Sequence, residues 1–205
     1  MHGTRKLGLR LLPSGEYLSW PDLAKACRDI VEASDNNLIV VMAACHGFNA
    51  AVEIRIRDLT PFTYLIAPST TVSAGQVDAA FTEFYRTLLA TGDFDETWEH
   101  LPPQYNVLDC EALLLVSYAR YVLENCKGKG KRQRLERLLT TFKNSAPGVD
   151  LSSNRQQLRQ LIRPSKASFE RFRGSFLLAD RPSNHGRFAA TFEHALKLVE
   201  QGRQL

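Results

Sequence analysis

The sequence predicts an α/β fold in its first half and a purely helical arrangement in its second half. Strand and helix patterns alternate up to residue 103, strand patterns disappear after it, and the charge balance changes sign at the same place. Alternating strands and helices are typical of a sheet covered by helices on both faces, a three-layer α/β/α sandwich. We therefore expect an α/β domain over residues 1–103 and an all-helical, basic extension over residues 104–205, with the boundary at Leu101-Pro102-Pro103.

The composition indicates a globular protein, because 44% of the 205 residues are hydrophobic and 23% are charged. Residues 1–103 carry 8 Lys and Arg against 13 Asp and Glu, whereas residues 104–205 carry 18 against 9. The longest apolar run, Leu38–Cys45, is far shorter than the roughly 20 residues that cross a bilayer, and the start lacks a signal-peptide core. These observations predict a cytoplasmic protein that does not associate with membranes.

The first predicted elements are a short strand and a helix. Residues Leu7–Leu12 alternate weakly in polarity and run into the turn signal Pro13-Ser14-Gly15, which predicts a strand and hairpin. Ser19 precedes a proline and an acidic residue, the pattern of a helix N-terminus, and an apolar stripe continues to about Ala33. Cys27 belongs to that stripe, so we expect it to lie in the core.

Three further strands and one helix complete the predicted α/β region. The apolar run over residues 38–44 predicts a strand buried on both faces, as in a parallel sheet. Residues 52–57 alternate between apolar and charged side chains, which predicts a half-exposed strand, and residues 62–67 predict a second buried strand that ends at Pro68. Ser73 and Gln76 have the spacing of a capping box and predict a helix over about residues 75–90.

The second half carries helical patterns only. They cover about residues 108–126, 131–144, 152–163, 165–173 and 186–201. Residues 127–137 hold six Lys and Arg in eleven residues with two glycines, which predicts a flexible basic connection. Because no aromatic residues interleave this segment, two interpretations stay open: a solvated loop, or a weak binding site for a polyanion or an acidic protein surface.

Cys45 is the candidate nucleophile, because it follows a predicted buried strand, at the edge of the sheet where ligands collect in α/β folds. A cysteine nucleophile needs a base, since a normal thiol is only slightly ionised at neutral pH. His46 is a poor base, because consecutive strand side chains point to opposite faces. His2 is the better candidate, and Gly3 after it allows a backbone amide to approach a substrate oxygen. The intervening strand–helix unit predicts that His2 and Cys45 end two adjacent parallel strands.

These residues resemble a known family. The chain carries three short segments in this order: His2-Gly3, Gly15-Glu16-Tyr17-Leu18-Ser19 and Ala44-Cys45-His46-Gly47. Together they resemble the caspase-like cysteine peptidases of clan CD, especially the bacterial CHAT-type and metacaspase-type members. The resemblance covers roughly residues 1–92 and extends to the Phe84-Tyr85 pair. It implies a His2–Cys45 dyad that hydrolyses protein or peptide substrates, with the amides of Gly3 and Cys45 as the oxyanion hole. It also implies a caspase-like version of the three-layer sandwich.

Two departures from the family pattern define further expectations. Metacaspase-like members carry an aspartate two residues before the cysteine for a basic substrate side chain, and this sequence has Ala43, so the substrate-binding residues stay unknown. Family members also have one or two strands before the dyad histidine. We therefore expect an incomplete sheet whose open edge is covered by a partner or a missing segment. The alternative function is a catalytically inactive caspase-like interaction or regulatory module.

The remaining cysteines and histidines favour structural roles. The four cysteines are widely spaced without a CxxC pair, which predicts free thiols, and Cys110 and Cys126 fall in a predicted helix as packing groups. His185-Gly186 precedes a helical pattern and is interpreted as part of its cap. No glycine-rich phosphate loop or zinc-binding motif is present, so we expect no cofactor and no metal.

Overall fold

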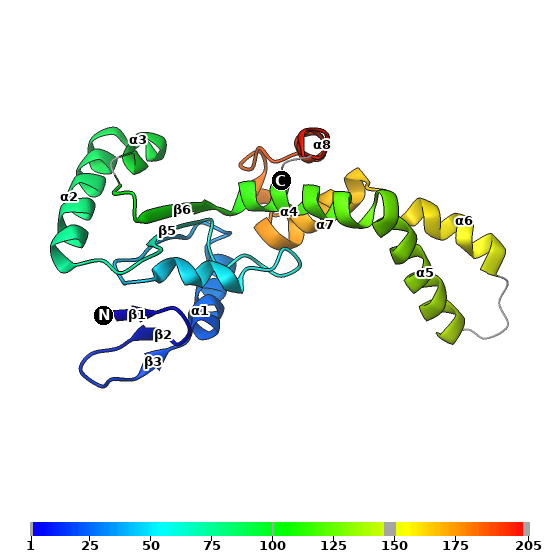
Figure 1. The fold of residues 1–205 in the computed structure, drawn as a ribbon. Helices are drawn as coiled ribbons and strands as arrows, with labels where there is room; N and C mark the ends of the chain where they lie inside the picture. Colours follow the sequence, from blue (N-terminus) through cyan, green and yellow to red (C-terminus); the bar gives the residue numbers. More distant parts are fainter. Residues whose placement is uncertain (1, 100, 146–150, 203–205) are drawn as a thin grey trace.

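The computed structural model describes residues 2–99, 101–145 and 151–202 as a mixed α/β fold with two separate three-stranded sheets (Figure 1). The amino-terminal sheet contains β1 (His2–Thr4), β2 (Gly8–Arg10) and β3 (Tyr17–Leu18), all antiparallel. The second sheet contains β4 (Ile39–Val41), β5 (Tyr64–Pro68) and β6 (Tyr105–Asp109). The prediction that the chain is a mixed α/β protein is thus confirmed.

The amino-terminal sheet confirms the predicted strand and hairpin around residues 7–12. The chain reverses between β2 and β3, where Leu11 N–H donates to the carbonyl of Glu16 and Gly15 N–H donates to the carbonyl of Leu11. Leu9 of β2 is buried in the main core. The indole of Trp20 donates hydrogen bonds to the carbonyls of Thr4 and Arg5, at 3.2 and 3.3 Å. These contacts fix the small sheet against the first helix.

The second sheet pairs β4 with β5 in parallel and β5 with β6 in antiparallel orientation. The parallel pair confirms one part of the prediction, and Leu65, Ile66 and Ala67 of β5 are fully buried. The predicted strand over residues 38–44 is too long, and it is not buried on both faces. Within the described residues β4 pairs only with β5, so it is an edge strand, and Ile39 is 36% exposed.

The prediction of a purely helical second half is also wrong, because β6 belongs to it. Residues 105–109 pair with β5 along its whole length, from Tyr64 opposite Asp109 to Pro68 opposite Tyr105. The sheet therefore draws one strand from beyond the predicted boundary at residue 103.

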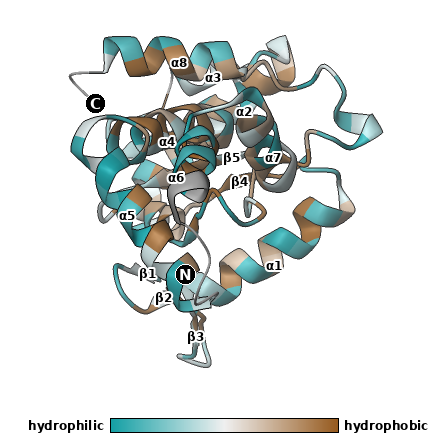
Figure 2. Ribbon diagram, turned by 90° about the vertical axis from the view of Figure 1, so that its right-hand side faces the viewer, coloured by the Kyte–Doolittle hydropathy of each residue, from teal (hydrophilic) through white to brown (hydrophobic). Residues whose placement is uncertain are grey.

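Two helices of the first half begin as their caps predict. Ser19 accepts from Asp22 N–H at the start of α1 (Trp20–Ala33), and Ser73 and Gln76 form the capping box of α2 (Ala74–Thr91). Apolar and polar residues alternate along α1 (Figure 2), and Cys27 is buried as expected. The short helix α3 (Phe94–Trp98) follows α2.

Residues 52–57 are not a strand. The chain forms the 3₁₀ helix η1 (Gly47–Glu53) and then turns, and no strand among the described residues pairs with residues 52–57. The Arg55 guanidinium donates to the carbonyls of Val52 and Ile54 in its own turn. The alternation arises because Ile54 and Ile56 pack against the core while Arg55 and Arg57 are exposed.

The helices of the second half are α4 (Cys110–Asn125), α5 (Gly128–Ser145), α6 (Leu151–Leu161), α7 (Lys166–Leu177) and α8 (Phe192–Gln201), with the 3₁₀ turn η2 (Pro182–Asn184) before α8. The predicted flexible basic connection lies mostly within α5. His185-Gly186 does not cap α8, because Thr191 caps that helix by accepting from His194 N–H; His185 instead ends η2, where its N–H donates to the carbonyl of Pro182. Gly186 has a positive φ of 75° in the preceding loop.

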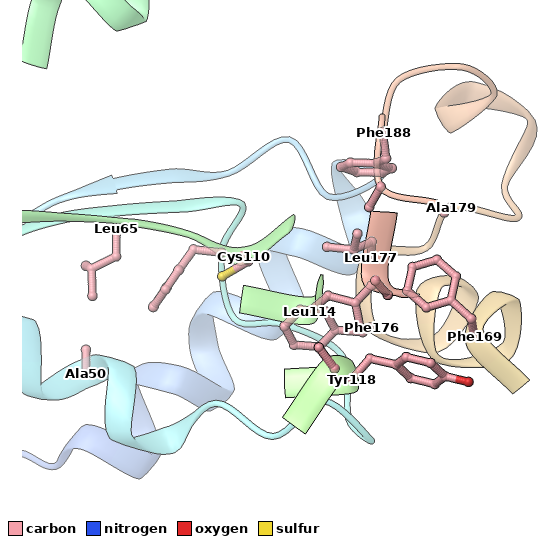
Figure 3. Packing of buried hydrophobic residues seen from close by; sticks show 14 of the residues in the cluster. Ala50, Leu65, Cys110, Leu114, Tyr118, Phe169, Phe176, Leu177, Ala179 and Phe188 are labelled. Carbon is pink, nitrogen blue, oxygen red and sulfur yellow. The ribbon is translucent and has the colours of Figure 1, made fainter. Parts of the chain in front are cut away.

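A single large hydrophobic cluster joins the sheets to the carboxyl-terminal helices. It combines Leu9, Trp20 and Leu65 from the first half with residues from α4, α7 and α8 in the second. The Tyr118 ring of α4 meets the Phe169 ring of α7 edge to face at 5.2 Å (Figure 3). Cys110 and Cys126 are buried in the same cluster, as predicted. Residues on both sides of position 103 thus share one core.

Among the described residues, no helix is both long and apolar enough to cross a membrane.

Candidate functional site

The candidate site is a pocket with a volume of about 470 Å³ that contains both predicted dyad residues. His2 enters from β1 and Cys45 from the loop after β4. The rest of the lining comes from the loop before Cys45, from the segment after β5 and from the first turns of α2: Ala43, Val72, Ala74, Val77 and Asp78. The structure therefore brings the two sequence-predicted residues to one cavity.

His2 and Cys45 do not reach this pocket in the predicted way. We expected two adjacent parallel strands, but β1 pairs with β2 in the amino-terminal sheet, and β4 pairs with β5 in the other sheet. The physical reason is the short connection between β1 and β2, which favours an antiparallel hairpin over a crossover. The two residues instead line the same pocket because β1 lies directly against the Cys45 loop.

Gly3 is the point of closest approach between β1 and that loop. A Cβ atom built on Gly3 would lie only 1.8 Å from the carbonyl oxygen of Cys45. Only a glycine allows the two backbones to be this close. Gly3 is buried, and it lies opposite Leu9 of β2 in the amino-terminal sheet. Gly3 thus sets the position of His2 relative to Cys45.

Backbone hydrogen bonds hold the Cys45 loop in place at the carboxyl end of the parallel pair. Met42 N–H donates to the carbonyl of Ile66 at 2.8 Å and extends the ladder of β4 and β5 by one residue. His46 N–H donates to the carbonyl of Thr70 at 3.0 Å. Gly47 packs closely, since a Cβ there would lie 3.0 Å from the Cβ of Met42. The loop therefore turns sharply and leaves Cys45 at the pocket.

The thiol of Cys45 contacts the backbone of Val72. Val72 N–H donates to Sγ at 3.4 Å, and the thiol donates to the carbonyl oxygen of the same residue at 3.5 Å. Burial leaves Cys45 only 7% exposed.

His46 directs its ring to the loop after β5, and residues 45 and 46 form a turn rather than the expected end of a strand. Its φ is +56°, its Nδ1 lies 3.1 Å from the carbonyl oxygen of Ser69, and its Nε2 lies 3.5 Å from Oγ1 of Thr71. The ring therefore attaches the Cys45 loop to the loop after β5. Its role in the structure is positional.

The other thiols are in different surroundings. Burial raises the pKa of Cys110 to about 12 and raises the pKa values of Cys27 and Cys126 above their ordinary value. None of these three residues lines the candidate pocket. All four cysteines are free thiols.

Val72, Val77 and Asp78 line the candidate pocket but were not predicted from the sequence. All three follow β5, and the carboxyl ends of neighbouring parallel strands converge at one edge of a sheet. That rule, applied to residues 68–78, was the available signal. Tyr105 of β6 was not predicted to have a special environment either. Its buried hydroxyl has no hydrogen-bond partner among the described residues, and burial, with a smaller contribution from Cys45, raises the pKa of this tyrosine.

Within the described residues, no group of three or more His, Cys, Asp or Glu side chains is placed to hold a metal ion. Comparison of the chain with known protein families, curated proteins and solved structures finds no match.

Proposed function

We propose that this protein is a cysteine endopeptidase that uses a His2–Cys45 dyad. The observation that carries the proposal is the common pocket of these two residues, with the backbone of Gly3 against that of Cys45. A histidine and a thiol at one cavity, with a donor directed at the sulfur, are the parts that nucleophilic attack on a carbonyl requires.

In the proposed reaction, His2 takes the proton of the Cys45 thiol, and Sγ attacks the carbonyl carbon of the scissile peptide bond. The carbonyl oxygen becomes an oxyanion, which the N–H groups of Gly3 and Cys45 stabilise. His2 then gives its proton to the leaving amine as the C–N bond breaks. Water hydrolyses the resulting thioester and restores the thiol. No cofactor is needed for this chemistry.

A caspase-like three-layer sandwich and a cytoplasmic location belong to the same proposal. The parallel pair β4 and β5, with Cys45 at its carboxyl end, supports the fold. The four free thiols fit a reducing compartment, where disulfides are rare.

The test measures alkylation of Cys45 by iodoacetamide, followed by mass spectrometry of the tryptic peptides, together with cleavage of a peptide library. Full-length wild type is compared with Cys45→Ala, His2→Ala and His46→Asn. Asparagine tolerates the positive φ of residue 46, so this variant is a matched control for loss of an imidazole beside the thiol. Circular dichroism verifies that each variant is folded.

We expect His2→Ala to slow alkylation at pH 7 and to reduce cleavage by about 100-fold or more, because a positioned base contributes at least about that factor. Cys45→Ala should abolish both signals, and His46→Asn should change them by less than about threefold. If His2→Ala alkylates and cleaves like the wild type, the dyad is wrong. Fast, His2-dependent alkylation without cleavage of any library peptide would instead support the inactive interaction module.

A further inference from the structure

A second pocket, far from Cys45 in the sequence and lined by other elements, lies where α4, α5 and α7 meet. Its volume is 480 Å³, which is in the range of small-molecule sites. Four arginines line it: Arg57 after η1, Arg134 of α5, Arg163 between α6 and α7, and Arg171 of α7. Among the described residues that line it there is no Asp or Glu.

Two arginines of this pocket differ from several other arginines of the protein in lacking a carboxylate partner. Arg86, Arg173 and Arg181 each form an ion pair with a nearby carboxylate. By contrast, no hydrogen bond or ion pair joins the Arg57 or Arg171 guanidinium to any other side chain that the structure describes. Several like charges around one cavity repel one another, and a bound anion removes this repulsion.

Further donors converge on the same cavity. Ser165 and Ser168 belong to its lining, and Ser165 caps α7 by accepting from Ser168 N–H at 3.2 Å. The amino-terminal end of a helix carries partial positive charge, which favours phosphate oxygens. Guanidinium groups bind the same oxygens in a two-pronged geometry. The lining therefore suits a ligand with several phosphate oxygens.

One wall of the pocket is aromatic. The Arg134 guanidinium lies 5.2 Å from the centre of the Tyr121 ring, and Phe172 packs against Tyr121 with ring centres 6.3 Å apart. Both rings belong to the pocket lining. This wall can contact an organic group attached to the phosphates. The concave shape favours a small molecule over an extended nucleic acid, whose backbone needs a long charged face.

We propose that this pocket binds a small organic phosphate with at least two phosphate groups, such as a nucleoside diphosphate or triphosphate. The proposal does not depend on the chemistry of Cys45. It also differs from a general attraction of residues 127–137 to polyanions, because only Arg134 of that segment belongs to the pocket.

The test is isothermal titration calorimetry of the full chain with ATP and with inorganic pyrophosphate, at a fixed salt concentration near 0.15 M. The pocket variant is Arg57→Gln, Arg163→Gln and Arg171→Gln combined. The control variant, Arg120→Gln, Arg137→Gln and Lys143→Gln combined, removes the same charge from helix surfaces outside the pocket. A parallel titration with heparin measures general polyanion binding.

We expect saturable binding of ATP by the wild type and a loss of roughly 100-fold in affinity in the pocket variant, because each charge-assisted hydrogen bond contributes about tenfold or more. The control variant should bind within about threefold of wild type. Pyrophosphate that binds as tightly as ATP would show that the phosphates alone are recognised. Lack of ATP and pyrophosphate binding by the wild type would overturn the proposal. Equal losses in both variants, with heparin bound more tightly, would replace it with a general basic surface.

Discussion

Side-chain hydrogen bonds join the two halves of the chain at one place, whereas backbone hydrogen bonds join the loops around Cys45. Where the turn Asp35–Asn37 meets the segment 177–187, which we call the junction, side chains from both halves form hydrogen bonds around a buried core. Around Cys45, the loops are joined mainly by backbone hydrogen bonds, and the pocket lies between two separate sheets. Regions with few buried side-chain contacts open more easily than a packed core. The difference predicts that the junction contributes more to the stability of the fold than the contacts around Cys45 do.

Replacement of Asn36 by alanine should break the junction and have the largest effect. Asn36 is fully buried with φ +60°, and its amide donates to the carbonyl of Leu177 at 3.0 Å. The Thr63 hydroxyl donates to the backbone carbonyl of Asn36 at 2.6 Å and lies 3.1 Å from its side-chain oxygen. Loss of these side-chain bonds and the cost of a positive φ should lower the free energy of unfolding by about 3 kcal/mol. Urea denaturation measures this change.

Asn36→Gly is the matched control, because glycine accepts the positive φ but lacks the amide. It should be less destabilised than the alanine variant by about 1 kcal/mol. Under native conditions, Cys45 alkylation should stay near the wild-type rate in both variants. A large change in that rate would show that the junction and the Cys45 pocket are coupled, and that the two regions do not act independently.

Gly3→Ala should have a smaller effect on stability but a direct effect on the pocket. The new methyl group would meet the carbonyl of Cys45, so β1 must move away from the loop. We expect a loss of about 1–3 kcal/mol in the free energy of unfolding and a clear slowing of Cys45 alkylation as His2 moves with its strand.

Gly75→Ala is the control for this substitution, because a Cβ at Gly75 in the first turn of α2 meets no atom within 4 Å. It should leave both stability and alkylation near the wild-type values. If Gly3→Ala behaves in the same way, β1 does not lie against the Cys45 loop as described.

Features that depend on neighbouring residues were predicted from the sequence more readily than features that depend on distant ones. Ser19, Ser73 and Gln76 act on backbone groups within a few residues, so local pattern was sufficient to locate the starts of α1 and α2. β6 was missed because its five residues gain their partner only through β5, far away in the chain. The pairing of β1 was missed for a different reason: its partner β2 follows after a short turn, whereas the expected parallel sheet placed His2 beside the strand before Cys45.

The glycines of the basic segment were misinterpreted as hinges. Gly130 lies within α5, and a Cβ there would be 1.6 Å from the carbonyl oxygen of Glu124 in α4. A glycine that allows close helix packing and one that allows flexibility look alike in a sequence. Cys45 and His2 were identified because their residue types carry chemistry, whereas Val72 contributes only backbone atoms, which no side-chain pattern reveals.

The acid sensitivity of the junction gives the smallest expected effect. Hydrogen bonds from Arg181, at 2.6 Å, and from Ser183, at 2.7 Å, hold the pKa of Asp35 below its usual value. A carboxylate whose pKa is lower in the folded state stabilises the fold above its unfolded pKa of about 3.9, and this contribution disappears as the pH falls through the folded pKa. Asp35→Asn should therefore be less stable than wild type at pH 7, and this difference should shrink as the pH falls below about 4.

Urea denaturation of both proteins between pH 7 and pH 3 measures this trend, and Asp29→Asn on the exposed face of α1 serves as the control. Because Asp35 is accessible to water, added salt should weaken the difference at pH 7. A difference between wild type and Asp35→Asn that is constant across this range would mean that the ionised carboxylate adds nothing to the junction. Its stability would then come from the hydrogen bonds of Asn36 and Asn37.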